Sequence, residues 1–397
     1  MTKSEYVRVG TTYYKMVNQP QLRGGSVRKR IPWSVETLRQ DHGKNFIADI
    51  PKYDGFCTVP SHTDYREEID NFLNLYEAID HVPEEGEFPH IESLVRHIFG
   101  EQYELGMDYL QLLYLRPVEK LPILLLVSEE RNTGKSTFLN FLKAIFQDNV
   151  TFNTNDDFRS QFNSDWAGKL LIVVDEVLLN RREDTERLKN LSTALTYKVE
   201  AKGKDRYEVP FYTKFVLCSN NERNPVLIDA EETRFWVRKV CLLESDDTQF
   251  LYKLKAEIPA FLFWLSNRQL STEQENRMWF RPSLIHTAAL DKIIRNNRSR
   301  VEIDMCEQIL EVMNEQNIGE FCFCINDLLS LLENTRHKVE RYQVRVVVQD
   351  FWKLTPAPNA YTYVTYEAAY LPQLTYKAAK RTGRYYKVTR AFLETLC

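Results

Sequence analysis

Six consecutive residues in the first half of the chain are of the types that bind a nucleotide phosphate; they are Asn132, Thr133, Gly134, Lys135, Ser136 and Thr137. An apolar run over 123–127 precedes them and apolar residues at helical spacing follow, which predicts a buried strand, a loop and a helix. Backbone N–H groups and the helix dipole converge where such a helix begins, and that place suits an anion. Lys135 is expected to reach the β- and γ-phosphates of ATP, and the Ser136 hydroxyl to bind Mg²⁺.

The loop departs from the P-loop pattern G-x-x-x-x-G-K-[ST] at one position, because Glu129 occupies the place of the first glycine. That glycine usually eases the turn from strand to loop. Glu129 therefore weakens the match but leaves the phosphate-contacting half intact. A strand–loop–helix with a chance Gly-Lys-Ser sequence is the alternative, and the residues further along the chain argue against it.

Two adjacent carboxylates, Asp175 and Glu176, end a second apolar run about forty residues after Ser136. A parallel strand in the same sheet would place Asp175 beside the Mg²⁺ and let Glu176 activate water for attack on the γ-phosphate. This is the Walker B pattern. Its distance from the first motif leaves room for a helix and a crossover connection.

A hairpin is predicted over 197–211, because its residues alternate as in two strands around Gly203. Its tip carries Lys202, Lys204 and Arg206, which suit the phosphates of a DNA strand passing through a pore. An ordinary exposed hairpin is the alternative, since lysine is common at such tips.

A third apolar strand, 214–217, is followed by Asn220, whose amide can bind the attacking water or the γ-phosphate. Arg234 follows and is a candidate arginine finger for the ATP of a neighbouring subunit. Arg238 is the rival candidate and Arg223 a weaker one, while an ordinary surface or ion-paired role for Arg234 stays open.

Composition bounds the class of protein. The 397 residues fit two or three domains, 43% are hydrophobic, and the net charge of −4 confines any nucleic-acid surface to local patches. The seven cysteines show no CxxC pair or Cys/His zinc spacing, the N-terminus lacks an apolar signal core, and no apolar run approaches the length of a membrane span. We therefore expect a reduced, cytoplasmic protein.

Around these motifs the chain is expected to divide into five parts. Helical spacing over 66–79 and 90–115 predicts helices before the nucleotide-binding core, and 251–270 predicts a helix interrupted near Pro259. Helices followed by two late strands suit a winged helix after residue 300. Its basic residues favour nucleic acid, with protein docking as the alternative; they are Lys377, Lys380, Arg381, Arg384, Lys387 and Arg390. The predicted parts are a small N-terminal β-containing module (1–64), a helical collar (65–116), an ATPase core (117–245), a helical lid with a basic linker (246–300) and a winged-helix-like domain (301–397).

The order and spacing of these elements resemble the superfamily 3 helicases. The phosphate-binding loop at 129–136, the carboxylate strand at 171–176, the basic hairpin at 198–206 and the strand with Ser219 and Asn220 lie within about a hundred residues, as that family's motifs do. The chain is most similar to the primase-helicases of phages and mobile elements, relatives of the poxvirus-type primase-helicase. The stretch before the core is shorter than we expect of a complete primase domain, so the resemblance is expected to cover the helicase part.

The resemblance implies an α/β protein with an AAA+-like P-loop NTPase core, a hexameric ring, and ATP hydrolysed between subunits to move single-stranded DNA. It implies that Lys135 and Ser136 bind phosphate and Mg²⁺, that Asp175 completes the metal site, and that Glu176 is the base. Asn220 becomes the sensor, Lys202 and Lys204 grip DNA, and Arg234 is the finger.

We therefore expect an ATP-dependent replicative DNA helicase of a phage or mobile element. It would need ATP and Mg²⁺, act on single-stranded or forked DNA, and work beside a separate primase or polymerase. Two rivals stay open. One is a different AAA+ motor that packages or remodels DNA, and the other is a non-enzymatic DNA-binding initiator.

Overall fold

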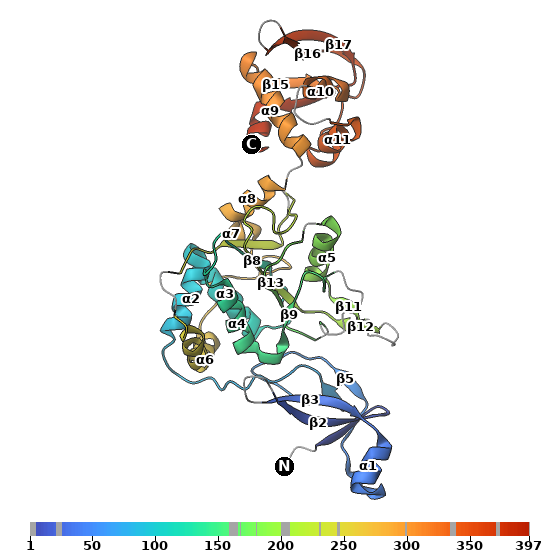
Figure 1. Cartoon of the computed structure of the whole chain (residues 1–397), viewed down its shortest axis with the longest axis vertical. Helices are drawn as coiled ribbons and strands as arrows, with labels where there is room; N and C mark the ends of the chain where they lie inside the picture. The colour runs from blue at the N-terminus through green and yellow to red at the C-terminus, as the bar shows by residue number, and fades with distance from the viewer. Residues whose placement is uncertain are drawn as a thin grey trace. The chain divides into compact units, whose positions relative to one another are not determined.

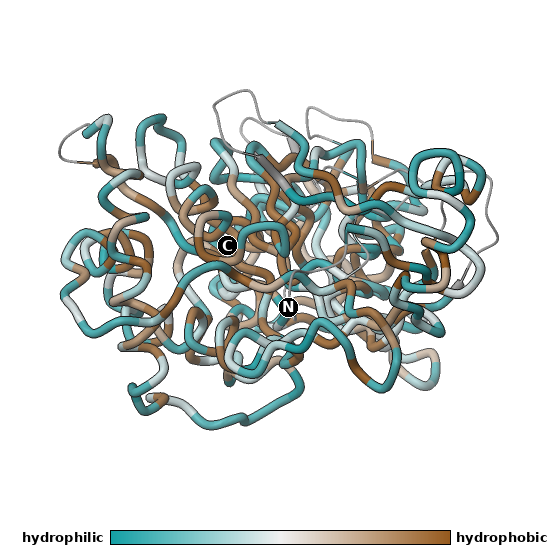
Figure 2. Tube along the Cα trace, turned by 90° about the horizontal axis from the view of Figure 1, so that it is seen from below, coloured by the Kyte–Doolittle hydropathy of each residue, from teal (hydrophilic) through white to brown (hydrophobic). Residues whose placement is uncertain are grey.

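The computed structural model describes residues 5–20, 26–158, 166, 168–179, 181–199, 207–229, 232–243, 247–297, 300–333, 339–370 and 374–396. The chain forms two compact units, residues 1–290 and residues 291–397 (Figure 1). Hydrophilic loops run along much of the outline of the trace (Figure 2). The finer division into five parts remains a prediction.

The first unit begins with a β-rich module. Its four-stranded sheet has the order β3-β2-β1-β4, and a small sheet has the order β5-β7-β6. Ser34 caps the helix that follows β3 by accepting a hydrogen bond from Thr37 N. The elements are β1 (Tyr6–Val9), β2 (Thr12–Pro20), β3 (Ser26–Trp33), α1 (Val35–His42), β4 (Lys52–Tyr53), β5 (Gly55–Cys57), β6 (Glu68–Ile69) and β7 (Phe72–Asn74).

The helix predicted over 66–79 was wrong. Strands β6 and β7 occupy part of that stretch as a hairpin, in which Glu68 pairs with Leu73 and Ile69 with Phe72. The two residues between them, Asp70 and Asn71, have φ values of 47° and 65°. A two-residue turn with two positive φ angles matches the twist of paired strands, and Asp and Asn adopt it at low cost. This local turn chemistry overrides the helical spacing.

The central sheet of the first unit is covered by the helices α2 (Pro89–Phe99), α3 (Tyr103–Leu115), α4 (Lys135–Phe146) and α6 (Phe250–Asn267). Their apolar faces join the buried sheet residues in one hydrophobic core. Helix α6 passes through Pro259 without ending there, which corrects the predicted interruption. A proline removes one hydrogen bond of the helix, and the burial of Ile258, Phe261 and Leu262 on either side holds the helix together.

A five-stranded parallel sheet forms the centre of the first unit. Its order is β14-β8-β13-β10-β9, and every neighbouring pair is parallel. The strands β8 and β10 are fully buried, which explains their continuous apolar runs. The strands are β8 (Ile123–Val127), β9 (Val150–Asn153), β10 (Leu171–Val174), β13 (Lys214–Ser219) and β14 (Phe235–Lys239).

Three further elements connect β10 to β13. Helix α5 (Arg182–Thr193) follows β10, and the hairpin strands β11 (Thr196–Val199) and β12 (Tyr207–Pro210) follow α5. The two strands pair antiparallel, with Val199 opposite Tyr207, as the alternating sequence predicts. A short helix, α7 (Pro282–Ile285), lies near the end of the first unit, and the boundary between the units falls within the next helix, α8 (Ala288–Asn296).

The second unit has its own hydrophobic core. Strand β15 pairs with β18, and β16 pairs with β17, both antiparallel. The sequence predicts helices followed by two late strands, whereas three strands follow α11 in the described part of the chain, because β17 forms from the basic stretch and pairs with β16. The elements are α9 (Arg300–Glu315), β15 (Glu320–Phe323), α10 (Ile325–Leu332), α11 (Arg341–Val346) with a π-helical turn (Val347–Phe351), β16 (Tyr361–Tyr370), β17 (Leu374–Gly383), β18 (Tyr386–Thr389) and α12 (Arg390–Leu396).

Among the described residues, no helix combines the length and the hydropathy that crossing a membrane requires.

Candidate active site

The predicted phosphate-binding loop connects β8 to α4 at the carboxyl edge of the parallel sheet. Gly134 caps α4 with a φ of +81°, a conformation that favours glycine, and a Cβ there would meet Leu243 and His97 at 3.6 and 3.8 Å. His97 donates a hydrogen bond of 3.0 Å from Nε2 to the carbonyl of Thr133. The loop is thus held from outside by α2, a contact that the spacing of the motif alone does not reveal.

Lys135 begins α4 and is 5% exposed. Its Nζ donates to Thr133 Oγ1 at 2.9 Å and to the carbonyl of Glu130 at 3.5 Å, so the side chain lies back along the loop. Among the described residues, no carboxylate lies within ion-pair distance of Nζ. Burial lowers the pKa of Lys135, and the more distant charges of Asp175 and Glu222 offset only part of that effect.

Ser136 and Asp175 lie next to one another, although 39 positions separate them in the chain. The Ser136 hydroxyl donates to Asp175 Oδ2 at 2.6 Å. Asp175 directly follows β10, and β13 lies between β10 and β8. The carboxyl ends of parallel strands share one edge of the sheet, which brings the two motifs together.

Glu176 and Asn220 are the second pair at this edge. Asn220 follows β13, the strand between the two motifs, and its Nδ2 lies 3.4 Å from Glu176 Oε1. Glu176 has a φ of 61°, which is uncommon for a residue with a side chain. Such strained backbone concentrates at functional sites, and here it turns the chain immediately after Asp175. Both side chains are exposed at the edge.

The unusual Glu129 has a structural explanation. Its φ is not positive, whereas Asn132 and Gly134 provide the left-handed turns of the loop at φ 57° and 81°. The Glu129 N–H donates to Glu222 Oε1 at 3.2 Å, and its carboxylate lies 3.8 Å from Arg223. The turn into this loop therefore does not require glycine. Sequence reasoning missed Glu222, a buried acid in a polar loop without a motif of its own.

The three candidate arginines lie in different places. The Arg238 side chain is 7% exposed and pairs with Glu101 at 2.6 Å, so its guanidinium is already committed within the chain. The Arg223 side chain is 74% exposed and lies near the carboxylate of Glu129, which belongs to the predicted phosphate-binding loop of the same chain. Arg234 immediately precedes β14, and its carbonyl accepts a hydrogen bond from Ile123 N at the amino end of β8.

Arg234 therefore lies at the amino ends of the parallel strands, whereas the phosphate-binding loop of its own chain lies at their carboxyl ends. Strand β8 runs from Ile123 to Val127 between these ends, a length of roughly 13 Å. An arginine side chain does not span that distance. Arg234 is a quarter exposed and lies 3.6 Å from Glu232, so its guanidinium does not reach the phosphate-binding loop of its own chain.

The predicted DNA-binding residues Lys202, Lys204 and Arg206 lie outside the described residues, between β11 and β12.

In the second unit, part of the predicted basic surface is paired. Arg381 contacts Asp327 and Glu367, and Lys387 lies 2.6 Å from Glu320. Carboxylates distant in sequence thus neutralise residues that form an uninterrupted basic series along the chain.

Comparison with known proteins places the site within a matched segment. A family described as of unknown function (DUF5906) matches residues 126–238, from the end of β8 into β14. All predicted site residues from Asn132 to Arg234 fall inside this segment. The DNA primase-polymerase of Nitratiruptor phage NrS-1 is 26% identical over 197 residues, which are 47% of this chain and 27% of that protein. The chain thus spans about a quarter of the length of this curated relative.

Solved structures of the C-terminal region of NrS-1 share the fold. One apo structure aligns with a TM-score of 0.64 at 16% identity, covering 96% of this chain and 95% of that region. A second apo form aligns with a TM-score of 0.56 at 18% identity, covering 85% and 81%. The chain is therefore a mixed α/β protein with a parallel sheet that resembles the C-terminal region of NrS-1.

Proposed function

We propose that the chain is an ATP-dependent DNA motor, the replicative helicase of a phage or mobile element, which hydrolyses ATP between subunits. The observation that carries the proposal is the meeting of Ser136 and Asp175 at 2.6 Å. Lys135, Glu176 and Asn220 lie at the same carboxyl edge of the parallel sheet, each directly after a strand or its loop. A hydroxyl and a carboxylate are oxygen ligands of the kind that Mg²⁺ takes, so the residues present fit this ion.

Each side chain has a role in this reaction. Lys135 and the backbone of residues 132–137 bind the phosphates, and the undercompensated charge of Lys135 suits them. Glu176 takes a proton from the attacking water, and Asn220 orients that water or the γ-phosphate. Mg²⁺ held by Ser136 and Asp175 would neutralise charge on the phosphates. The core corresponds to an AAA+-like P-loop NTPase.

Arg234 supports the assignment to an oligomer. Because it lies at the edge opposite its own nucleotide site, it acts as a finger only if a neighbouring copy presents its ATP there. A hexameric ring satisfies this requirement. In such a ring, Lys202, Lys204 and Arg206 on the β11–β12 hairpin contact single-stranded DNA, and the winged-helix-like second unit provides further contacts.

The phage relative supports the biological setting. That protein is named a DNA primase-polymerase, and this chain is similar to part of it. We place the proposed activity in phage DNA replication in the bacterial cytoplasm, beside a separate primase or polymerase.

The test is ATP turnover and unwinding of forked DNA with 5′ or 3′ tails by the purified protein. Wild type is expected to release phosphate and displace the strand. Lys135→Ala is expected to lose both activities, while Lys255→Ala, which changes an exposed lysine of α6, retains them. Equal phosphate release by wild type and Lys135→Ala would contradict the proposal that the protein hydrolyses ATP at this site.

The two rivals give different results in the same assays. Turnover stimulated by single-stranded DNA without strand displacement favours a packaging or remodelling motor. DNA binding without nucleotide binding or turnover favours an initiator.

A further inference from the structure

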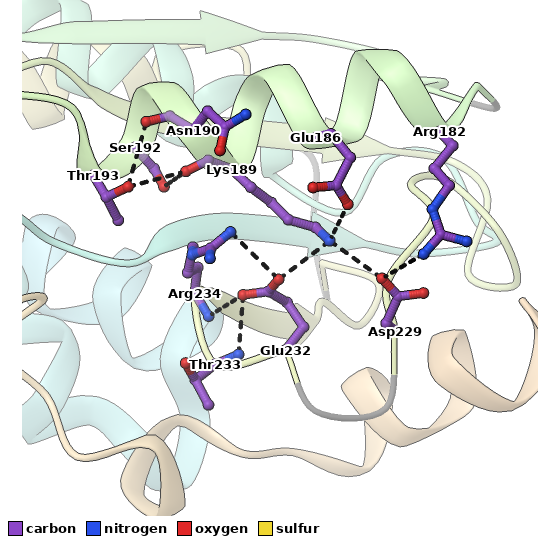
Figure 3. Close-up of polar contacts among 10 residues, drawn as sticks. All are labelled: Arg182, Glu186, Lys189, Asn190, Ser192, Thr193, Asp229, Glu232, Thr233 and Arg234. Atoms are coloured by element: carbon purple, nitrogen blue, oxygen red, sulfur yellow. Dashed lines mark hydrogen bonds and ion pairs between the residues drawn. The ribbon is translucent and has the colours of Figure 1, made fainter. Parts of the chain in front are cut away.

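A buried lysine lies on α5, away from the phosphate-binding loop. Lys189 is 3% exposed, and three carboxylates surround its Nζ: Glu186 at 2.7 Å, Asp229 at 3.3 Å and Glu232 at 3.3 Å (Figure 3). Arg182 reaches the same Asp229 at 3.6 Å. Lysine is rarely buried to this extent unless it is paired, so the three carboxylates are needed to stabilise Lys189 in the folded chain.

Glu232 connects this cluster to Arg234. Its Oε1 accepts the backbone N–H groups of Thr233 at 3.0 Å and Arg234 at 2.9 Å. Its Oε2 lies 3.3 Å from Lys189 Nζ and 3.6 Å from Arg234 Nη1 (Figure 3). Lys189 and the Arg234 guanidinium therefore share one carboxylate oxygen, and the same residue fixes the Arg234 backbone.

The shared oxygen has a consequence for the arginine. The Glu232 side chain is 8% exposed, so without a cation at the Lys189 position its charge would be left undercompensated. The Arg234 guanidinium is the other cation in contact, and a bidentate pair with Glu232 would be its most stable arrangement. With Lys189 present, the Arg234–Glu232 contact is long and the guanidinium is a quarter exposed.

We infer that Lys189 is a positioning residue for Arg234: by neutralising Glu232, it leaves the Arg234 guanidinium available to a γ-phosphate bound by a neighbouring subunit. The inference rests on the proposed function. It also connects the finger to α5, which follows the Asp175–Glu176 strand and leads into the β11–β12 hairpin. Lys189 does not itself touch the nucleotide.

The first test measures ATP hydrolysis by Lys189→Met and Lys189→Arg. A finger displaced by about an ångström is expected to lower kcat by about 100-fold in Lys189→Met, with KM for ATP changed little because the finger acts on the transition state. Lys189→Arg retains the charge and is expected to recover most of the activity. A loss confined to KM, or an unchanged kcat in Lys189→Met, overturns the inference.

A double variant separates positioning from folding. Lys189→Met/Glu232→Gln removes the lysine and the carboxylate that captures the arginine, so its kcat is expected to exceed that of Lys189→Met at least about tenfold. Thermal unfolding of each variant is measured in parallel. If the folded double variant is as slow as Lys189→Met, Lys189 does not act through Glu232 and the inference fails.

Mixed oligomers test the action between subunits. Lys189→Met subunits have an intact nucleotide site, and Glu176→Gln subunits have an intact Arg234, so an equal mixture is expected to be more active than the sum of its parts. If this mixture shows no gain while a mixture of Arg234→Ala with Glu176→Gln does gain, Lys189 affects the nucleotide site of its own subunit and not that of a neighbour, which overturns the inference. Absence of turnover in wild type instead contradicts the proposed function.

Discussion

Two lysines buried in the same unit have opposite electrostatic surroundings. Lys135 in the phosphate-binding loop contacts a hydroxyl and a carbonyl, and burial lowers its pKa. Burial alone would also lower the pKa of Lys189, but its hydrogen bond to Glu186 and the charges of Glu232 and Asp229 outweigh that effect and raise the pKa. No carboxylate of the described residues lies within ion-pair distance of Lys135, while three carboxylates surround Lys189.

In the proposed function, this difference separates a binding site from a positioning network. A buried, undercompensated cation is costly, and a bound phosphate would remove that cost at the carboxyl ends of the strands. The Lys189 network has no such need, and its Arg234 lies at the amino ends of the strands. In the proposed function, each copy contributes one edge to a shared site. Five predictions follow, from the largest expected effect to the smallest.

The largest expected effect is at the carboxyl edge. Glu176→Gln removes the base but not the phosphate or metal contacts, so we expect kcat for ATP hydrolysis to fall by up to about 10⁴-fold with nucleotide binding retained. Single-turnover phosphate release and binding of a fluorescent ATP analogue measure the two quantities. Glu183→Gln, an exposed acid at the start of α5, is the control. A similar loss of kcat in Glu176→Gln and Glu183→Gln would show that Glu176 is not the base.

At the opposite edge, Arg234→Ala is expected to lower kcat by about 10³-fold. Mixing with Glu176→Gln subunits should restore activity, because about a quarter of the interfaces in a random equal mixture combine an intact site with an intact finger.

Arg238→Ala provides the contrast. This arginine is bonded to Glu101 and Gln102 within the chain, so its loss is expected to lower the free energy of unfolding by about 1–2 kcal/mol and not to be rescued by mixing. Rescue of Arg238→Ala but not Arg234→Ala would exchange their roles. Urea unfolding and turnover of the mixtures measure the two effects.

Alkaline pH should affect the two lysines in sequence. Phosphate favours charged Lys135, whose pKa in the free protein is lowered, so ADP affinity is expected to fall by up to about tenfold per pH unit above that pKa. The raised pKa of Lys189 means that its contribution to stability is fully present below 10.5 and is lost only as pH rises through the higher folded-state value. ADP titrations and thermal unfolding between about pH 8 and about pH 10 compare them. Loss of stability before loss of affinity is the contrary result.

The smallest expected effect is at Glu129. Since its φ is not positive, Glu129→Gly should not improve the loop. We expect kcat/KM to change by less than about twofold, and the free energy of unfolding to fall by about 0.5–1 kcal/mol from the added flexibility of the unfolded chain. A large gain in turnover would show that Glu129 impairs the site. Steady-state ATPase assays and urea unfolding are sufficient.

Local residues made much of the fold predictable. The continuous apolar sequence at 123–127 and 171–174 predicts the two buried strands. Gly134 predicts the loop before α4, because glycine readily adopts the left-handed conformation that this position has. The hairpin at 68–74 was missed because its turn depends on two residues, whereas helical spacing was counted over fourteen. The continuity of α6 through Pro259 was missed because burial of neighbouring residues outweighs one lost hydrogen bond.

The sequence by itself determined which residues could do chemistry: a phosphate-binding loop, two carboxylates after a strand, an asparagine and several arginines. Only the tertiary structure decided how they combine. The interposed strand β13 brings Ser136 against Asp175 and Asn220 toward Glu176. The parallel register puts Arg234 beside Ile123, at the amino ends of the strands and away from the phosphate-binding loop. An ion pair with Glu101 occupies the Arg238 guanidinium within the chain. Residue types and spacing do not encode these choices, because they depend on which strands become neighbours and which charges burial forces together.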